Sequence, residues 1–450
     1  MMSETSFNWN LLTIAEAVQG KLVGDDLSVE GITTDTRYAT SRELFIALQG
    51  PNFDGHDYLE QAEKKGIAAV LVDHEVSTSL PQIIVADTHT ALGKLANAWR
   101  MQFSIPLVAI TGSNGKTTVK EITTSILSQR HKVLATKGNL NNDIGVPLTL
   151  LRLGPEHSAA VIEMGANHLK EIEYLADLAK PTVAVITNAS SAHLEGFGNL
   201  EGVAKAKGEI YSGLTEKGAA IINSDDGYSN YWQSLCTNKN ISTFGLNHDA
   251  DFSIKKKDKK IVISTPTGSI SANYPLPGEH NLSNALAATA ACSAVGVSLD
   301  DVKSGLEAMQ AVTGRLQARK GKAGSCIIDD TYNANPGSLK VALQVLREYP
   351  GEHLLALGDM GELGDASERL HLDAGEQARK LGVNKLYAIG KFGKFSAQSF
   401  GENGYVFEDQ PSMISEIGNH LAEDVTLLVK GSRVMQMENI VNALAANGES

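Results

Sequence analysis

A glycine-rich segment between an apolar run and a helical stretch carries the strongest chemical signal in this 450-residue sequence. It follows the apolar residues 107–110 and ends in Gly115-Lys116-Thr117. Backbone N–H groups of such a loop can bind phosphate, Lys116 can reach the β- and γ-phosphates of a nucleotide, and Thr117 can bind Mg²⁺. The pattern departs from the full Walker A motif, because Ile110 stands where that motif has its first glycine, and a functionless strand-to-helix turn is the alternative. We expect a phosphate loop formed by Thr111, Gly112, Ser113, Asn114, Gly115, Lys116, Thr117 and Thr118.

Two more polar groups follow predicted strands nearby in the chain. Glu163 ends the apolar run 159–162, and His193 follows the apolar run 183–186. In a parallel sheet the carboxyl ends of the strands lie at one edge, so both residues could lie near the phosphate loop. A carboxylate is a usual Mg²⁺ ligand and histidine a less usual one, which makes a metal role for the pair a hypothesis. Taken singly, each is more often a solvated or capping residue.

Amides and a dense polar loop mark the later part of the chain. Asn281 and Asn284 lie one helical turn apart at the start of an Ala-rich helix, where they could contact a purine base, or where Asn281 or Ser283 could simply cap the helix. Further on, Arg315 and the polar run 329–336 combine an arginine with two acids, a tyrosine and two amides. A loop this polar directly after an apolar strand is rarely structural, so we expect a functional role.

The elements that must position these residues predict an α/β fold in three domains. Short unbroken apolar runs alternate with helices, which is typical of parallel sheets covered on both faces. Residues 1–86 form a small first domain with strands near 44–48, 68–72 and 83–86, and a helix from about 88 to 101 leads away from it. Residues 87–314 form a central parallel-sheet domain with strands near 107–110, 159–162, 183–186 and 219–222. Residues 315–450 form a Rossmann-like third domain with strands near 326–328, 354–357, 386–389 and 426–429.

Composition narrows the functional classes. Hydrophobic residues make up 42% of the chain and charged residues 20%, which is typical of globular proteins. The net charge of −13 argues against nucleic acid or an anionic membrane as a partner. The basic run 255–260 lies between alternating apolar residues, which predicts the exposed turn of a β-hairpin. Three dispersed cysteines argue against disulfides and a cysteine zinc site, and the N-terminus has no secretion signal or membrane span, so we expect a cytoplasmic protein.

Together these segments resemble the Mur ligase family of bacterial cell-wall synthesis over essentially the whole chain. The family's phosphate loop has the pattern T-G-[ST]-[NS]-G-K-[ST], which residues 111–117 match and which accounts for the missing first glycine. The runs 138–147, 192–198 and 332–335 favour the branch that adds D-alanyl-D-alanine. The resemblance implies a monomeric, ATP- and Mg²⁺-dependent enzyme in which the terminal carboxylate of UDP-N-acetylmuramoyl-tripeptide attacks ATP. The resulting acyl phosphate is then attacked by the amine of D-alanyl-D-alanine.

The resemblance also implies roles for individual residues. Lys116, Glu163, His193 and Lys207 would be catalytic, with Thr117, Glu163 and His193 holding Mg²⁺. Asn281, Arg315, Asp330 and Tyr332 would contact ATP beside the phosphate loop. The UDP-sugar would lie against Thr34, Asp35, Thr36, Arg37, Asn52, Phe53, Asp54, His56, Asn139 and Asn142. The peptide or dipeptide would face Asn333, Asn335, Asp359, Glu362, Lys430, Ser432 and Arg433.

Lys207 is a special case, because several Mur ligases carry a carbamoylated lysine four residues before a tyrosine, as Lys207 stands before Tyr211. Carbamoylation needs a neutral amine, so the site would have to lower the pKa of this lysine by burial or by nearby cations. A solvated helix residue is the alternative.

Other classes of protein remain as alternatives. A nucleotide-dependent switch protein or a non-catalytic nucleotide-binding protein would use the same loop but would not need the first and third domains. Folylpolyglutamate synthase shares the phosphate loop and the later domains, but not this first segment.

Overall fold

The first sheet of the computed structural model, which describes residues 7–190, 194–257 and 260–446, belongs to the N-terminal unit. It has five strands in the order β2-β9-β8-β5-β4, of which only β2 is antiparallel. The expected strands near 44–48, 68–72 and 83–86 are confirmed. The elements of this unit are β1 (Trp9–Asn10), α1 (Leu11–Val18), β2 (Lys21–Val23), β3 (Ser28–Val29), β4 (Gly31–Thr33), β5 (Glu43–Ile46), β6 (Gln49–Gly50), β7 (Phe53–Asp54), the 3-10 helix η1 (Gly55–Tyr58), α2 (Leu59–Lys64), β8 (Ala69–Val72) and β9 (Gln82–Ile84).

A six-stranded, fully parallel sheet forms the centre of the molecule, in the order β11-β12-β10-β13-β14-β15. Successive residues of β10 enter two different apolar cores, Leu107 and Ala109 on one face and Val108 and Ile110 on the other. Burial on both faces explains the unbroken apolar runs of the sequence. The strands are β10 (Leu107–Thr111), β11 (Val133–Ala135), β12 (Ala159–Glu163), β13 (Val183–Ile186), β14 (Ala219–Asn223) and β15 (Asn240–Phe244).

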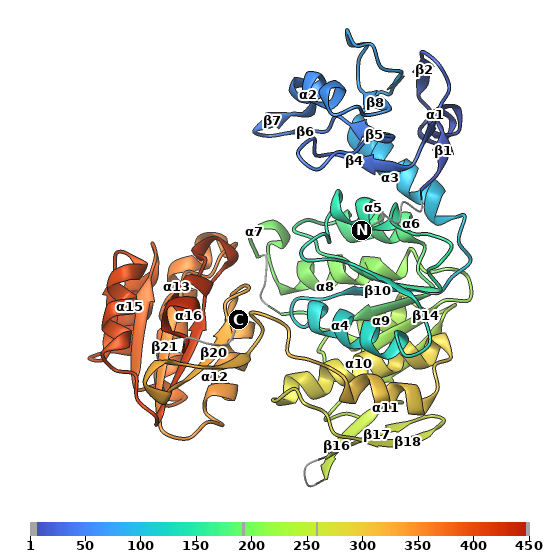
Figure 1. Cartoon of the computed structure of the whole chain (residues 1–450). Coiled ribbons are helices and arrows are strands. Elements are labelled where there is room, and N and C mark those ends of the chain that lie inside the picture. Colours follow the sequence, from blue (N-terminus) through green and yellow to red (C-terminus); the bar gives the residue numbers. More distant parts are fainter. Residues whose placement is uncertain (1–6, 191–193, 258–259, 447–450) are drawn as a thin grey trace.

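Helices cover both faces of the central sheet (Figure 1). The core on one face includes α4, α10 and α11, and the core on the other face includes α3, α5, α6 and α8. The helices are α3 (Thr88–Arg100), α4 (Lys116–Leu127), α5 (Gly145–Leu150), α6 (Glu171–Ala179), α7 (Leu194–Phe197), α8 (Leu200–Gly208), α9 (Ser229–Ser234), α10 (Glu279–Val295) and α11 (Leu299–Glu307).

The central unit also carries an antiparallel sheet of β16 (Ser253–Lys257), β17 (Lys260–Thr265) and β18 (Gly268–Ala272). Lys257 pairs with Lys260 across the first hairpin, which confirms the predicted hairpin strands, and the turn at 258–259 lies outside the described residues. The strands β11, β15 and β18 are not predicted by the sequence pattern, because they are short or mixed with polar residues.

The C-terminal unit contains a six-stranded sheet in the order β19-β20-β24-β21-β22-β23, parallel except for the edge strand β19. Its four expected central strands are confirmed. The elements are β19 (Gln317–Lys320), β20 (Cys326–Asp330), α12 (Pro336–Leu346), β21 (Glu352–Gly358), the 3-10 helix η4 (Gly364–Ala366), α13 (Ser367–Lys380), β22 (Lys385–Ile389), α14 (Gly393–Phe400), β23 (Gly404–Phe407), α15 (Gln410–Gly418), β24 (Val425–Lys430) and α16 (Glu438–Leu444).

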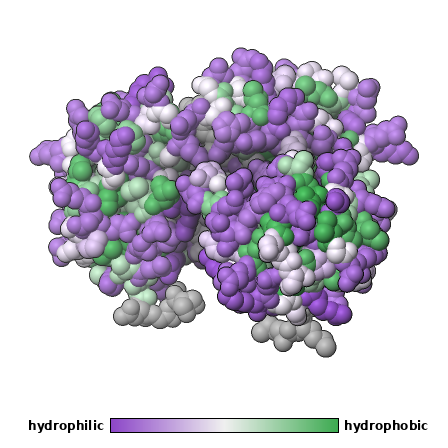
Figure 2. Space-filling model, turned by 90° about the horizontal axis from the view of Figure 1, so that it is seen from above, coloured by the Kyte–Doolittle hydropathy of each residue, from purple (hydrophilic) through white to green (hydrophobic). Residues whose placement is uncertain are grey.

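The N-terminal and C-terminal units contact the central unit in different ways. Leu92 and Leu95 of α3 share one apolar core with Leu11 of α1 and Ala109 of β10, so the first two units pack together through hydrophobic side chains. The C-terminal unit lies beside the central one and has separate apolar cores (Figure 1). The face shown in Figure 2 is mostly hydrophilic and is hollowed between the C-terminal unit, on the left, and the other two units. In the part of the chain that the structure describes, no helix has the length and hydrophobicity needed to cross a membrane.

Candidate active site

The phosphate loop connects β10 to α4 with a backbone that only glycine accommodates easily. Gly112 and Gly115 have φ angles of 147° and 82°. A Cβ atom on Gly112 would lie 1.9 Å from Thr187 Oγ1, and one on Gly115 would lie 2.5 Å from Asn284 Oδ1. Both positions therefore need a positive φ and the absence of a side chain. The loop leads directly into the N-terminus of α4, as expected for a site that binds anions.

The loop is held by the residues that follow β13, the strand beside β10. Ser113 N–H donates to Asn188 O at 2.9 Å, and Thr187 Oγ1 donates to Asn114 O at 2.6 Å. Asn114 Nδ2 donates to Ser190 Oγ at 2.7 Å. The site prediction omitted Thr187, Asn188 and Ser190, although their place after a strand of the same sheet was the available signal.

Lys116 lies over the loop rather than extending into solvent. Its Nζ donates to Gly112 O at 2.7 Å and to Ser113 O at 3.3 Å. Burial lowers the pKa of Lys116, and the charge of Arg315 lowers it further, whereas Glu163 and Glu362 raise it. Acidic and basic groups of two units thus act on this lysine. Within the described residues its Nζ donates to neutral carbonyls alone, which it can exchange for a phosphate.

Glu163 provides a buried carboxylate at the end of β12. Its Oε1 accepts a hydrogen bond of 2.8 Å from Asn141 Nδ2, while Oε2 is buried without a hydrogen-bond partner among the described residues. An unpaired buried carboxylate oxygen is costly unless a cation approaches it, so this group fits Mg²⁺. His193, the other predicted protein ligand besides Thr117, lies outside the described residues. Asn141 was not predicted to position Glu163.

Arg315 brings the C-terminal unit to the phosphate loop. Its guanidinium lies 4.1 Å from the centre of the Tyr332 ring, and its Nη2 donates to Thr117 Oγ1 at 3.4 Å. Asp330 holds this segment, because Leu316 N–H donates to Asp330 Oδ1 at 3.2 Å. The opposite oxygen, Asp330 Oδ2, is paired with the buried Lys430 ammonium group, and burial lowers the pKa of Lys430. Arg315 is therefore directed at the loop, while Asp330 and Lys430 position it.

The amides of α10 also meet the phosphate loop. Asn281 Nδ2 donates to Pro277 O at 2.7 Å, and Asn284 Nδ2 donates to Asn281 Oδ1 at 3.2 Å. The N-cap residue of α10 is Gly278, so the alternative of a helix cap by Asn281 or Ser283 is wrong. The Asn281–Asn284 pair stands against Gly115 at the base of the loop.

Lys207 is fully buried on α8, so the alternative of a solvated lysine is wrong. Its Nζ lies 5.2 Å from the centre of the Phe197 ring. Burial, together with the nearby positive charge of Lys116, lowers the pKa of Lys207 to about 7. The two conditions that we expected for a neutral amine, burial and a neighbouring cation, are both present.

The residues expected to bind the UDP-sugar lie in two groups. In the N-terminal unit, Arg37 forms a two-bond ion pair with Asp35, and Thr36 Oγ1 donates to Gln61 Oε1 at 2.6 Å. Asp54 and His56 are hydrogen-bonded to each other, Phe53 is exposed, and Thr34 and Asn52 lie in the adjoining loops. In the central unit, Asn139 and Asn142 precede α5, a helix that lies on the side facing the N-terminal unit (Figure 1). Asn142 Oδ1 accepts from Gly145 N–H at 2.9 Å, so part of its capacity serves the start of that helix.

The residues expected to face the peptide fall into two places. Asn335 caps α12, and its Nδ2 also donates to Asn114 Oδ1 at 2.9 Å, so Asn335 lies at the phosphate loop. Close to it in the chain, Asn333 O accepts a hydrogen bond from Lys430 Nζ. The others line a second loop region beyond β21 and β24: Ser432 N–H donates to Asp359 O, Glu195 N–H donates to Glu362 O, and the exposed Arg433 is paired with Glu438. Ser432 Oγ is buried without a partner in the described chain.

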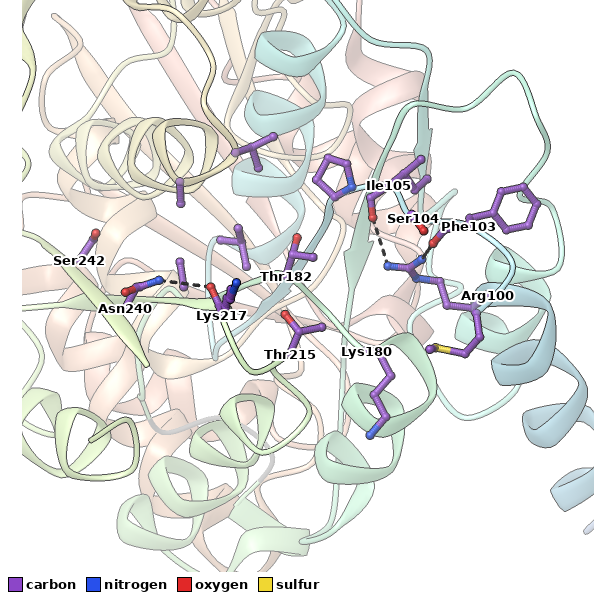
Figure 3. Close-up of a pocket in the computed structure, with 16 residues that line it drawn as sticks. Arg100, Phe103, Ser104, Ile105, Lys180, Thr182, Thr215, Lys217, Asn240 and Ser242 are labelled. Atoms are coloured by element: carbon purple, nitrogen blue, oxygen red, sulfur yellow. Dashed lines mark hydrogen bonds between the residues drawn. The ribbon is translucent and has the colours of Figure 1, made fainter. Parts of the chain in front are cut away.

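A pocket of about 670 Å³ lies at the other edge of the central sheet, where β10, β13, β14 and β15 begin. Figure 3 shows its polar groups bonded to backbone, with Arg100 donating to Phe103 O and Ile105 O and Asn240 donating to Lys217 O. The phosphate loop lies at the opposite, carboxyl ends of the strands, so this pocket is separate from the candidate site.

Family models and relatives match nearly the whole chain. The Mur ligase middle domain matches residues 110–292, the Mur ligase glutamate ligase domain residues 314–433, and the Mur ligase family catalytic domain residues 28–100. The UDP-N-acetylmuramoyl-tripeptide–D-alanyl-D-alanine ligase of Escherichia coli is 45% identical over 97% of this chain and 98% of its own. A crystal structure of MurF from Acinetobacter baumannii is similar with a TM-score of 0.92 and 37% identity, covering 97% of this chain and 99% of that one. MurF from Thermotoga maritima in complex with ADP has a TM-score of 0.82 and 27% identity, covering 92% and 96%.

Proposed function

The chain belongs to the Mur ligase family, and from this premise we propose how its residues carry out the reaction. It is an ATP-dependent ligase that joins D-alanyl-D-alanine to UDP-N-acetylmuramoyl-tripeptide through an acyl phosphate. The product is the UDP-N-acetylmuramoyl-pentapeptide from which peptidoglycan is built. The observation that carries our assignment of roles is that Arg315 Nη2 donates to Thr117 Oγ1 of the phosphate loop, where the charges of Arg315 and Glu163 both act on the pKa of Lys116.

The first step requires two anions to approach each other. The tripeptide carboxylate attacks the γ-phosphorus of ATP, and the repulsion between them must be offset by positive charge. Lys116 exchanges its carbonyl partners for the β- and γ-phosphates, and Arg315 adds a second positive charge from the C-terminal unit. Tyr332, stacked on the guanidinium of Arg315, keeps that side chain directed at the loop.

The second step transfers the acyl group to an amine. The amine of D-alanyl-D-alanine attacks the activated carbonyl carbon, and inorganic phosphate leaves. We assign the binding of the peptide or the dipeptide to Asp359, Glu362, Asn333, Ser432 and Arg433. The contact between Asn335 and Asn114 keeps the two units closed over the reacting groups and protects the acyl phosphate from water.

Mg²⁺ fits the unpaired oxygen of Glu163, with Thr117 and His193 as the further protein ligands. Bound there, it would neutralise phosphate charge and orient the γ-phosphate. Lys207 is also proposed to be catalytic, because its carbamate would supply a carboxylate-like ligand for a second Mg²⁺ beside the acyl-phosphate oxygens. Asn281 is proposed to contact the adenine.

The UDP-sugar is assigned to the N-terminal unit, with Arg37 and His56 as its principal contacts and Asn142 closing the site from the central unit. We further propose two domain limits. The first, at 86/87, lies just before α3, and the second, at 314/315, makes Arg315 the first residue of the C-terminal domain. Because all of these groups belong to one chain, a monomer suffices. The cytoplasm, where ATP and UDP-sugars are available, is the proposed location.

A phosphate-release assay tests the function and the alternatives together. The chain is incubated with ATP, D-alanyl-D-alanine and either of two UDP-tripeptides, which carry meso-diaminopimelate or L-lysine as the third residue. Sustained phosphate release should require both the dipeptide and one UDP-tripeptide. ATP turnover that depends on neither substrate would indicate a nucleotide-dependent switch. A parallel reaction with a folate and glutamate in place of these substrates tests for folylpolyglutamate synthase, which would release phosphate there.

A further inference from the structure

Two histidines and an aspartate meet in the N-terminal unit, far from the phosphate loop along the chain. His56 belongs to η1, and Asp73 and His74 directly follow β8. One ligand atom from each, an imidazole nitrogen or a carboxylate oxygen, lies within 4.8 Å of the other two. The imidazole rings of His56 and His74 are stacked with their centres 4.8 Å apart. Asp73 and His74 have no role in the ligase reaction proposed above, whereas His56 is assigned there to the UDP-sugar, so an ion bound here would lie at the edge of that proposed site.

The hydrogen bonds of His56 determine which of its nitrogens is available. Asp54 Oδ1 lies 2.6 Å from His56 Nδ1. A carboxylate oxygen accepts hydrogen bonds, so the ring N–H of His56 is at Nδ1. In this tautomer Nε2 carries a lone pair, and Asp73 N–H donates to it at 3.4 Å. A carboxylate that orients a histidine in this way is the usual outer partner of a metal-binding imidazole.

Nε2 of His56 also lies 3.3 Å from Asp73 Oδ1, so in that tautomer two acceptors face each other. Ligands of a tetrahedral Zn²⁺ lie about 2.0–2.2 Å from the metal, which places them about 3.3–3.5 Å from one another. The same Asp73 oxygen is hydrogen-bonded to His74 Nδ1 at 2.5 Å, closer than two ligands of one metal ion, so His74 would shift away from Asp73 when an ion binds. A cation between these atoms would replace the hydrogen bonds that His56 Nε2 and Asp73 Oδ1 make now with two metal–ligand bonds, and His74 would add a third.

We propose that His56, Asp73 and His74 bind one divalent transition-metal ion of the zinc type, with Asp54 orienting His56. Imidazole nitrogen with carboxylate oxygen suits Zn²⁺, Co²⁺ and Ni²⁺ rather than Mg²⁺, which prefers oxygen ligands. The His56 side chain is only 9% exposed, whereas that of His74 is 64% exposed, so the ion would be anchored on a buried ligand and open to solvent on one side. A fourth position would remain for water or for an oxygen of a bound molecule.

Cobalt binding tests the site without reference to enzyme activity. The untagged full-length chain is titrated with Co²⁺ in the presence of excess Mg²⁺, because Mg²⁺ occupies sites built from oxygen ligands. The visible absorption of tetrahedral Co²⁺ is recorded, and the number of Co²⁺ ions bound per chain is determined. We expect one equivalent of Co²⁺, displaced by Zn²⁺. His74→Ala and Asp73→Asn should each weaken binding at least about 100-fold, and Asp54→Asn about 10–100-fold.

His248→Ala is the matched control, because His248 is 68% exposed and paired with a single aspartate, Asp225, at 2.8 Å. It should bind Co²⁺ as the parent chain does, and circular dichroism should show all four variants folded. His74→Gln serves if His74→Ala does not fold. The proposal is overturned if the parent takes up no Co²⁺ under these conditions, if uptake is unchanged by Asp73→Asn and His74→Ala, or if one ion is shared by two chains.

Discussion

Asn335 Nδ2 donates a hydrogen bond of 2.9 Å to Asn114 Oδ1, and this bond joins the C-terminal unit to the phosphate loop across 221 residues of sequence. Asn335 also caps α12, where its Oδ1 accepts from Ser338 N–H at 2.8 Å. One amide thus starts a helix with its oxygen and fixes the position of that helix relative to the nucleotide site with its nitrogen.

Asn335→Asp should separate these two functions. The carboxylate keeps the helix cap but cannot donate to Asn114, and it adds a negative charge near the phosphates. We expect kcat to fall at least about tenfold with little change in thermal stability. Asp409→Asn, which alters the N-cap of α15 in the same unit, is the control and should have parental kcat. Equal kcat values in the two variants would show that the contact does not support catalysis.

Gly115→Ala tests the fit of the phosphate loop. The new Cβ would lie 2.5 Å from Asn284 Oδ1 in a backbone with a φ of 82°. Gly66→Ala is a matched control, because Gly66 has a φ of 75° but no atom within 4 Å of the added Cβ. Backbone strain of about 1–3 kcal/mol applies to both, so only Gly115→Ala should also lose ATP affinity, by at least about tenfold in calorimetry. An equal loss in Gly66→Ala would assign the effect to strain alone.

Lys116→Ala should reduce ligation to less than about 1% of the parental turnover, because the main positive charge on the phosphates is removed. UDP-tripeptide binding, measured by calorimetry, should persist, since we assign that substrate to the N-terminal unit. Turnover of more than a few per cent would contradict the role of Lys116. Loss of UDP-tripeptide binding in the same variant would instead indicate a wider structural change.

The strands and the phosphate loop were predictable because both are local. Four or five consecutive apolar residues with buried faces, such as 107–110, identify a strand without knowledge of its neighbours. Gly115 and Lys116 were predictable for the same reason, because the residues that form the phosphate loop are consecutive in the chain. The location of a site at the carboxyl ends of the strands follows from parallel topology alone.

Contacts between distant segments could not be predicted in this way. Nothing near Glu163 in the sequence indicates that Asn141 donates to it, and nothing near Asn335 indicates Asn114. Such pairs depend on the relative placement of whole elements, and both amides occur in polar runs where several residues could have taken the role. Lys207 is intermediate, because its spacing from Tyr211 suggested a role but only its burial explains a lowered pKa.

His89 and Asp143 should make the contact between α3 and the loop before α5 sensitive to pH. His89 Nε2 lies 3.2 Å from Asp143 Oδ2, so this bond links α3 to the loop that holds Asn142. The bond raises the pKa of His89 and lowers that of Asp143. The stabilisation is fully present below the ordinary histidine pKa of 6.5 and is lost as the pH rises through the raised value. At the acid end it is lost only as the pH falls through the lowered pKa of Asp143.

His89→Gln should therefore lower the thermal midpoint more at about pH 6 than at about pH 8.5, where the parental histidine is neutral. His248→Gln, which alters a separate histidine–aspartate pair, provides the control for the general effect of losing an exposed imidazole. A difference between parent and His89→Gln that stays constant over this pH range would contradict the proposed ion pair.

Lys207 offers the sharpest test of the chemistry, because its carbamate is an anion whereas its unmodified side chain is neutral or positively charged. A neutral Nζ would attack the carbon of CO₂, and loss of one N–H proton would leave a carbamate anion. With the pKa lowered to about 7 by burial, a large fraction of the amine is neutral at physiological pH.

Lys207→Ala should lower ligase turnover at least about 100-fold, and formate should restore part of it by supplying a small carboxylate in the vacated space. Lys207→Met tests whether a folding defect explains the loss of turnover in Lys207→Ala. The methionine side chain has a similar length and can be buried without the cost of burying a charge, so this variant should be folded but inactive. Lys205→Ala is the matched control, because Lys205 is on the same helix but exposed and paired with Glu201 at 2.7 Å, and it should keep parental activity. Depleting CO₂ from the buffer should slow the parent and leave the formate-rescued variant unaffected. Near-normal turnover of Lys207→Ala in CO₂-depleted buffer would exclude the carbamate and leave Glu163 as the main protein anion at the metal.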